Sequence, residues 1–436
     1  MQNKTQKNSH FLTGFRIISA IWHFIFKKRN ALNHIMTGKF TAKRIAIAAA
    51  AAVGIIMVIL LFVPPYKGVA DDGSLYKVMG RTGLTYIEND PEDIYNNYFI
   101  KRYLLEDNSH SHKKFGSSQD VIIRTAILLD KILTRDQYFD IRFLAFLYCI
   151  MYLPAIYLIV KYTCMSIKYF SEAIMIATLA VIIFADISFI TYFNSLYPEA
   201  VWIISILYCC GAIFRMQKVE CSYLSLALLG VFGALLCMTR QHCGVIGFIL
   251  AGFSIGAFFL NNKLSWKIYC ILTTFALCIT AMLSIFKLET DFNLTSKYHA
   301  MTRGILFQAE DPEVALNEFG INPSYAVLAK TSAYNSYPFV KVDDEQLQEG
   351  FYDKYDYSDI LIYYLKHPVS FLRMLDVAVK NMNSLRRSFC GNYEKSVGLP
   401  KMAQGLFWSG WSNFKVRFAP KTIGYLFLLI IFAYFL

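Results

Sequence analysis

Charged residues are scarce in this sequence of 436 residues, because Asp, Glu, Lys and Arg together make up 17% of it, against roughly 25% in soluble domains. The deficit falls in apolar runs of about 18–20 residues, the length that a helix needs to cross a hydrocarbon core of ~30 Å. Backbone polar groups in lipid must be paired within the segment, so these runs predict helices and not strands. The sequence therefore excludes an ordinary soluble protein and predicts an all-α integral membrane protein.

Acidic residues are absent from residues 1–44, whereas Lys and Arg are frequent there. An excess of cations beside the first apolar run is the positive-inside signal of a cytoplasmic tail, and it also favours contact with anionic lipid heads. The net charge of +12 is thus explained by the membrane and gives no support to nucleic-acid binding. The run 45–63 is long and no small-residue cleavage pattern follows it, so we expect a span and not a cleaved signal peptide.

Motifs for metals, nucleotides and soluble hydrolases are also missing. There is no CxxC pair or His/Cys cluster, and nine of the ten cysteines lie in or beside apolar runs, which leaves Cys390 alone in a large polar segment. We therefore expect no metal site, no required cofactor and no disulfide scaffold. The absence of GKS/T and HExxH excludes an ATP-driven pump and one class of hydrolase.

Eight apolar runs organise the chain. With residues 1–44 inside as a basic cytoplasmic tail, residues 64–141 and 287–421 fall outside, and every short inner loop is basic, as the positive-inside rule requires. The transmembrane core then covers 45–286, with seven spans and the outer loop 64–141. An outer helical segment, 287–421, precedes the final span, 422–436. The runs are 45–63, 142–160, 172–192, 199–214, 222–238, 243–260, 267–286 and 422–436.

Each outer segment contains a stretch that is helical in pattern but too polar to span. In 115–133, apolar residues recur at helical spacing from Ile122 to Leu133, behind Ser117 and Ser118 as N-caps. In 357–387 the pair His367-Pro368 predicts a break and a new helix that starts at the proline. We expect these non-spanning helices to lie on the outer membrane face and to form the walls of a pocket.

The first polar cluster that could carry chemistry is Asp71-Asp72-Gly73, shortly after the first span. Adjacent carboxylates near low-dielectric surroundings raise each other's pKa, which suits one of them to act as a general base. Asp-Gly is also a common turn dipeptide, so a plain surface turn is the alternative.

The second cluster lies in the outer turn between the third and fourth runs. An ionisable residue such as Asp186 inside an apolar run is costly and needs a partner or a water-filled cavity. Interfacial aromatic belts account for Tyr192 and Phe193 but not for the polar residues beside them. The candidate ligands of this cluster are Asp186, Asn194, Tyr197 and Glu199.

The third cluster, Thr239 to His242, contains a cation on the outer side. Arg240 opposes the positive-inside trend, so it should have an anionic partner, either a carboxylate (Asp186 or Glu199) or a substrate phosphate. His242 is a polar turn residue or a further ligand.

In the second outer segment Arg373, Lys380 and Arg387 recur every seven residues and so share one helix face. This face is either an interfacial amphipathic helix that meets lipid heads, or one on which Arg373 or Arg387 grips a lipid phosphate.

The stretches DDGSLYKVMGRTGL and ITYFNSLYPEA, together with the basic tail, the first span and the non-spanning helices, resemble the GT-C superfamily of membrane glycosyltransferases. Within it they are similar to the WsfD-type hexosyltransferases of bacterial glycan assembly. The resemblance covers residues 45–436 and implies a GT-C-like polytopic helical bundle.

The resemblance further implies an inverting transferase whose donor is a hexose on undecaprenyl phosphate. Asp72 or Asp71 would deprotonate the acceptor, a cell-envelope glycan or a lipid-linked molecule. Arg240, Arg373 and Arg387 would stabilise the lipid phosphate that leaves.

Two other functions fit parts of the pattern. A surface-polysaccharide polymerase or ligase would depend on outer arginines instead of an aspartate pair. A lipid-linked oligosaccharide translocase would place polar residues near the bilayer midplane, where the apolar runs are almost uncharged.

Overall fold

The computed structural model of the chain describes residues 42–87, 97–106, 116–287, 291–333, 341–381 and 390–435. The basic tail before residue 42 and Arg387 lie outside these residues. The chain forms two compact units, each described here by itself. Unit 1 comprises Met1–Ile285 and Ser388–Trp411, and unit 2 comprises Phe286–Arg387 and Ser412–Leu436.

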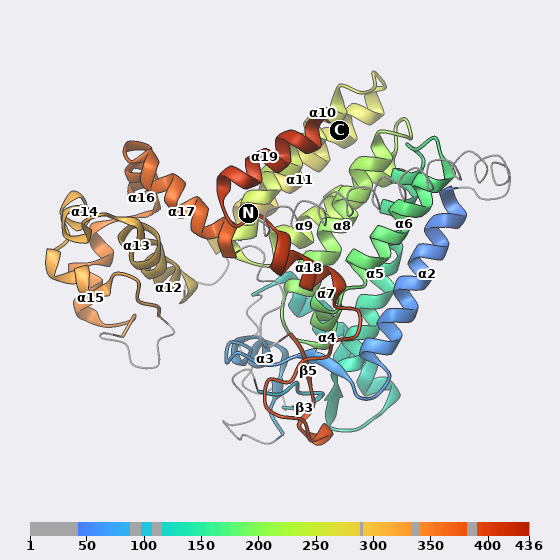
Figure 1. Cartoon of the computed structure of the whole chain (residues 1–436), viewed down its shortest axis with the longest axis horizontal. Coiled ribbons are helices and arrows are strands. Elements are labelled where there is room, and N and C mark those ends of the chain that lie inside the picture. Colours follow the sequence, from blue (N-terminus) through green and yellow to red (C-terminus); the bar gives the residue numbers. More distant parts are fainter. Residues whose placement is uncertain are drawn as a thin grey trace, which may run out of the picture. The chain divides into compact units, whose positions relative to one another are not determined.

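Unit 1 is a bundle of apolar helices that lie side by side, with α5 between α2 and α8 (Figure 1). Five helices in the described residues are long and apolar enough to cross a membrane, which confirms a helical membrane protein. They are α2 (Ala42–Leu61), α5 (Ile141–Cys164), α8 (Glu199–Met216), Gln241–Phe258, which comprises η2 (Gln241–Cys243) and α10 (Gly244–Phe258), and α11 (Leu264–Lys287).

The remaining three predicted runs are also helical but differ from a simple span. The run 172–192 is a bent pair: α6 (Phe170–Phe184) ends early, and the chain turns by 49° into α7 (Ile187–Ile190) and η1 (Thr191–Asn194). The other two are shorter apolar helices, α9 (Tyr223–Cys237) and α19 (Ile423–Phe435). Five crossings, or six with the bent pair, satisfy length and composition, and the total of eight stays a prediction.

Unit 1 also contains two small antiparallel sheets, so the described residues are not purely helical. One sheet pairs β1 with β5, and the other has the order β2-β3-β4. The elements are β1 (Lys67–Val69), α3 (Tyr76–Thr82), β2 (Leu84–Thr85), β3 (Arg102–Leu105), α4 (Ser118–Leu133), β4 (Tyr138–Asp140), β5 (Cys390–Tyr393) and η6 (Lys395–Val397).

Helix α4 confirms the predicted non-spanning helix and its cap. The Ser117 side chain accepts from the Gln119 N–H, and the Asp120 carboxylate accepts from the Ser117 N–H, which closes a capping box. Along this helix Leu133 is 64% exposed, whereas Ile123 is fully buried. The face of α4 that includes Asp120, Ile123 and Ala126 packs inward.

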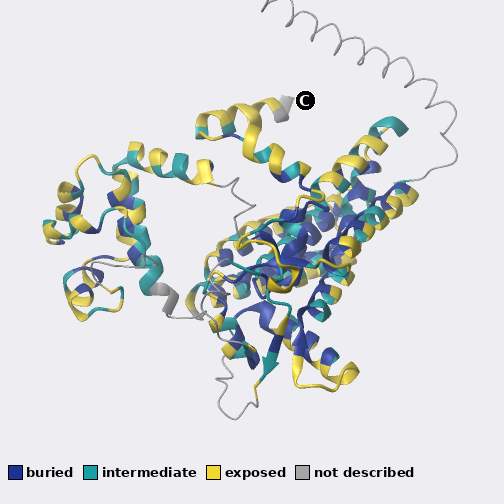
Figure 2. Cartoon of the chain, turned by 60° about the horizontal axis from the view of Figure 1, so that its bottom comes forward, coloured by how far each residue is buried: buried dark blue, intermediate teal, exposed yellow. Residues whose placement is uncertain are grey.

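Unit 2 has its own small core, which is built largely from aromatic side chains, including Phe351 and Tyr352. The predicted break at His367-Pro368 is confirmed, since one helix ends at Lys366 and the next begins at Pro368. Figure 2 shows that exposed residues are frequent along these helices. The elements are α12 (Asp291–His299), η3 (Ala300–Ile305), α13 (Leu306–Gln308), α14 (Pro312–Glu318), η4 (Pro323–Leu328), α15 (Glu345–Gly350), η5 (Tyr352–Lys354), α16 (Tyr357–Lys366), α17 (Pro368–Asn381), α18 (Gly410–Phe418) and α19.

Candidate active site

The Asp71-Asp72-Gly73 stretch forms the tight turn that its composition favours. The Gly73 N–H donates to Asp71 Oδ1 at 2.7 Å, and Gly73 has a φ of 89°, which a residue without a Cβ adopts at little cost. The next carboxylate repeats the pattern, because Asp72 Oδ1 accepts from the Ser74 N–H at 3.0 Å and from its hydroxyl at 2.6 Å. The backbone therefore fixes both carboxylates in place.

The two aspartates have very different surroundings. Asp71 is 2% exposed and its second oxygen, Oδ2, accepts from the Tyr86 hydroxyl. Burial raises the pKa of Asp71, and hydrogen bonds from Tyr86 and Gly73 oppose that rise. The neighbouring charge of Asp72 contributes least, so the expected mutual effect of the pair is a minor one. Asp71 is therefore a carboxyl group held inside the fold.

Asp72, in contrast, is exposed, and its backbone is held by a residue of the second cluster. Its N–H donates to the Tyr197 hydroxyl oxygen at 2.7 Å, and the Tyr197 hydroxyl donates to the Ala70 carbonyl at 3.3 Å. Burial, together with the charge of Asp72, raises the pKa of Tyr197 and keeps it a neutral phenol. The first and second clusters are thus in direct contact.

The second and third clusters are joined by an ion pair. Arg240 Nη2 lies 2.7 Å from Glu199 Oε1, so Glu199 is the carboxylate partner that the position of Arg240 required. Glu199 is at the start of α8, where the helix dipole favours an anion. His242 is exposed in η2, two residues beyond Arg240. Its role as a ligand stays a prediction.

The start of α4 connects these clusters further. Ser117 Oγ donates to the Thr239 carbonyl at 3.0 Å, and Gln119 Nε2 donates to the Tyr197 carbonyl at 2.8 Å. Asp120, beside them, forms a buried ion pair with Arg81 at 2.8 Å. This helix therefore holds the Tyr197 turn and the Thr239–Arg240 turn against each other.

Two predicted ligands of the second cluster are engaged within the fold. Asn194 is fully buried, and its side-chain amide donates to the carbonyls of Leu61 and Lys67, which ties η1 to the end of α2 and to β1. Asp186, also fully buried, caps α7 by accepting from the Ser188 N–H at 2.9 Å and its hydroxyl at 2.7 Å. Ser188 is thus one partner of the buried Asp186. A role for either residue in substrate binding stays a prediction.

The cations predicted in the second outer segment belong to unit 2. Arg373 forms an exposed ion pair with Glu310 at 2.8 Å, and Arg387 lies outside the described residues. Their contact with a lipid phosphate stays a prediction.

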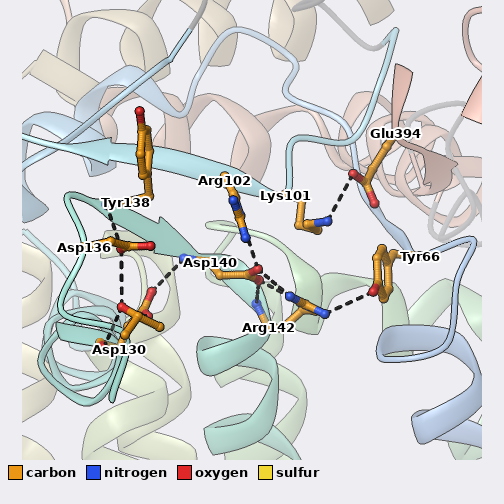
Figure 3. A network of polar contacts seen from close by, with 10 residues as sticks. Tyr66, Lys101, Arg102, Asp130, Asp136, Tyr138, Asp140, Arg142 and Glu394 are labelled. Carbon is orange, nitrogen blue, oxygen red and sulfur yellow. Dashed lines mark hydrogen bonds and ion pairs between the residues drawn. The ribbon is translucent and has the colours of Figure 1, made fainter. Parts of the chain in front are cut away.

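A polar network around Asp140 was not predicted from the sequence (Figure 3). The Asp140 carboxylate caps α5 and receives two hydrogen bonds from Arg142, at 2.9 and 2.7 Å, while Arg102 Nε lies 3.7 Å away. The Arg142 guanidinium also donates to the Tyr66 hydroxyl at 3.1 Å. In the predicted topology Arg142 begins a run on the outer side, and this is the signal, already used for Arg240, that could have identified it.

The same network joins the late segment of unit 1 that contains Glu394 to residues from early in the chain. Lys101 Nζ lies over the Tyr66 ring and 3.6 Å from Glu394 Oε2 (Figure 3). Nearby, Lys67 is 8% exposed, and burial lowers its pKa.

The described residues contain no group of three or more His, Cys, Asp or Glu that could hold a metal ion.

The apolar helices of unit 1 define the class of the protein, an integral membrane protein. The chain belongs to the YfdI N-terminal transmembrane domain family, whose model matches residues 29–436. No curated protein and no solved structure matches the chain.

Proposed function

We propose that the chain is an inverting GT-C-type glycosyltransferase of the cell membrane. It transfers a hexose from an undecaprenyl-phosphate donor to a cell-envelope glycan or a lipid-linked acceptor, on the outer face. Membership of a family of transmembrane domains is in keeping with a membrane-embedded transferase.

The observation that carries the proposal is the contact between Asp72 and Tyr197. It joins the loop after the first span to the turn that contains Glu199, and Glu199 in turn binds Arg240. An exposed carboxylate and a guanidinium from distant parts of the sequence are thereby connected through one short turn. A transferase with an anionic leaving group needs this combination of a base and a cation.

In the proposed step Asp72 takes the proton of an acceptor hydroxyl, and the hydroxyl oxygen attacks the anomeric carbon of the donor. The bond from that carbon to the phosphate oxygen breaks, and the lipid phosphate leaves with the electron pair. Attack from the opposite face inverts the anomeric centre. We assign the base to Asp72 because Asp71 is buried and its two oxygens already accept from Gly73 and Tyr86.

Arg240 has the position of a cation for the leaving phosphate. Its side chain is 44% exposed, and the bond to Glu199 uses an N–H of a group that carries five donors. Glu199 orients the guanidinium, which then needs no rearrangement as negative charge develops on the phosphate.

The test compares Asp72→Asn with Asp71→Asn in transfer from undecaprenyl-phosphate hexose, with the unfolding temperature measured alongside. We expect Asp72→Asn to lower kcat by about 10²–10⁴-fold, the usual contribution of a general base, with little change in unfolding temperature. Asp71→Asn should change stability more than the reaction.

Full transfer by Asp72→Asn would overturn the assignment of the base. If Arg373→Ala abolished transfer while Asp72→Asn did not, the polymerase or ligase alternative would replace the proposal. If the chain moved lipid-linked oligosaccharide across vesicles without transferring sugar, it would be a translocase.

A further inference from the structure

The segment Gln404–Ser409 of unit 1, called here the 404–409 loop, lies far along the chain from the helix that it contacts. The Trp408 indole N–H donates to the Val181 carbonyl of α6 at 3.3 Å, and the Trp408 carbonyl accepts from the Ile187 N–H of α7 at 3.1 Å. The loop is therefore attached to the bent pair at the point where it breaks.

The lengths of the neighbouring helices set the depth of that break. Helix α2 has 20 residues and so covers about 30 Å, the thickness of the hydrocarbon core. Its last residue, Leu61, accepts from Asn194 at the end of η1, so η1 ends level with the end of α2. Helix α6 has 15 residues and covers only ~22 Å. The break after Phe184 consequently lies below that level, within the hydrocarbon core.

A helix break at this depth exposes backbone groups that lipid cannot satisfy. The 404–409 loop and Asp186 provide the missing partners: Trp408 accepts from the Ile187 N–H, and Asp186 accepts from the Ser188 N–H. Two further backbone groups of the loop are also paired, since Gly405 donates to the Gly391 carbonyl at 2.8 Å and Ser409 Oγ donates to the Leu406 carbonyl at 2.8 Å. Non-helical backbone at membrane depth requires partners of this kind from the protein.

Close packing around position 405 explains why the loop has a glycine there. A Cβ on Gly405 would lie 3.0 Å from Lys67 Cδ and 3.2 Å from Ile187 Cδ1, so only glycine fits there without displacing a neighbour. The tip carries large apolar side chains instead. Leu406 is 76% exposed, Phe407 43% and Trp408 36%.

We propose that the 404–409 loop re-enters the membrane and presents Leu406 and Phe407 to the acyl chains of the lipid bilayer. The loop continues an apolar surface that already faces lipid, because Met175, Leu179 and Ile182 of α6 are exposed along the same helix that Trp408 contacts. Apolar side chains at hydrocarbon depth are stable without a protein partner, whereas on a water-facing loop they would form a costly exposed patch.

The proposal differs from the expected topology, in which 287–421 lies wholly outside the bilayer. It does not depend on the reaction, since it rests on the helix break and the loop contacts alone.

The experiment uses the full chain in lipid nanodiscs, with a cysteine introduced by Leu406→Cys and labelled with the fluorophore NBD. Labelling of the unsubstituted chain measures the background from the native cysteines. Leu179→Cys on α6 is the lipid-facing reference. Gly80→Cys on α3 is the reference on the outer side, where a Cβ meets nothing within 4 Å.

We expect nitroxides on the lipid acyl chains to quench the probe at position 406 as strongly as at 179, and several-fold more than at 80. Iodide in the water should quench in the reverse order. Strong quenching at 406 by iodide would overturn the proposal. Protection from both quenchers would overturn it too, because another part of the chain or a second copy would then cover the loop. Phe407→Cys repeats the measurement at a second position of the tip.

Discussion

The backbone N–H of Asp72 donates a 2.7 Å hydrogen bond to the Tyr197 hydroxyl oxygen, across 125 positions of sequence. This bond fixes the main chain of the proposed base and leaves its carboxylate exposed. Tyr197 does not need to touch the substrate to affect the reaction. It acts as a positioning residue, and that role can be separated from catalysis.

Tyr197→Phe removes the hydroxyl and leaves the buried Ala70 carbonyl and the Asp72 N–H without this partner. A lost partner of a buried polar group costs about 1–3 kcal/mol. We expect kcat to fall by roughly tenfold, the change in rate that about 1.4 kcal/mol produces, with a smaller change in donor KM. Tyr192→Phe is the matched control, because Tyr192 is buried in the same turn and its hydroxyl accepts from the Cys390 thiol. An equal loss of kcat in both variants would contradict the positioning role.

The raised pKa of Asp71 predicts a pH dependence of stability. The folded state binds the Asp71 proton more readily than the unfolded chain does, so the contribution of this group falls as the pH rises above about 4. Asp71→Asn removes the titration. The unfolding temperature of the unsubstituted chain should therefore decline relative to that of Asp71→Asn as the pH rises from about 4 through the raised pKa of Asp71.

The pH comparison is made on detergent-solubilised protein at constant ionic strength. Asp130, whose pKa burial also raises, contributes equally to both proteins and cancels in the difference. A difference that does not change with pH would show that Asp71 titrates as it does in the unfolded chain.

The ion pair between Arg240 and Glu199 allows its structural and catalytic roles to be separated. Both side chains are partly exposed, so we expect a coupling energy of about 0.2–1 kcal/mol in a double-mutant cycle on stability. If Arg240 also binds the donor phosphate, Arg240→Ala should raise the donor KM far more than Glu199→Gln does. Equal effects on KM would leave Arg240 with a structural role alone.

Two glycines, Gly68 in β1 and Gly80 in α3, provide a matched test of how closely the chain packs around β1. A Cβ on Gly68 would lie 2.6 Å from the Asn194 carbonyl oxygen and would overlap the Phe99 ring, whereas a Cβ on Gly80 meets nothing within 4 Å. Overpacking typically costs about 1–3 kcal/mol, so Gly68→Ala should lower the unfolding temperature markedly. Gly80→Ala lies in a helix and should raise it slightly. Unfolding temperatures of the two variants in the same detergent decide the matter.

Local patterns in the sequence predicted the features that depend on near neighbours. The cap at Ser117 and the break at His367-Pro368 both follow from backbone preferences that act over a few residues, and both are confirmed. For Arg240 the sequence predicted either a carboxylate partner, Asp186 or Glu199, or a substrate phosphate, because an unexpected charge indicates that a partner exists without identifying it. The structure supplies that partner.

Features that depend on contacts between segments far apart in the sequence could not be predicted in this way. Nothing near Lys67 or Ile187 in the sequence indicates that residues 390–409 pack against them. The break after Phe184 was missed for the same reason. The mean hydropathy of the run 172–192 does not reveal a bend, and the Ile187 N–H at this bend donates to the Trp408 carbonyl, far along the chain. Long-range pairing of short segments leaves no periodic signal.

The pairing of β1 with β5 has a consequence for biosynthesis. Strand β1 ends at Val69 and its partner begins at Cys390, so a ribosome that adds about 5–20 residues per second makes the second strand roughly 15–65 s after the first. Throughout that interval α2 is already synthesised, while the edge of β1 stays unpaired. The β1–β5 sheet of unit 1 is therefore among the last parts of the protein to mature, although its first strand is among the earliest to be made.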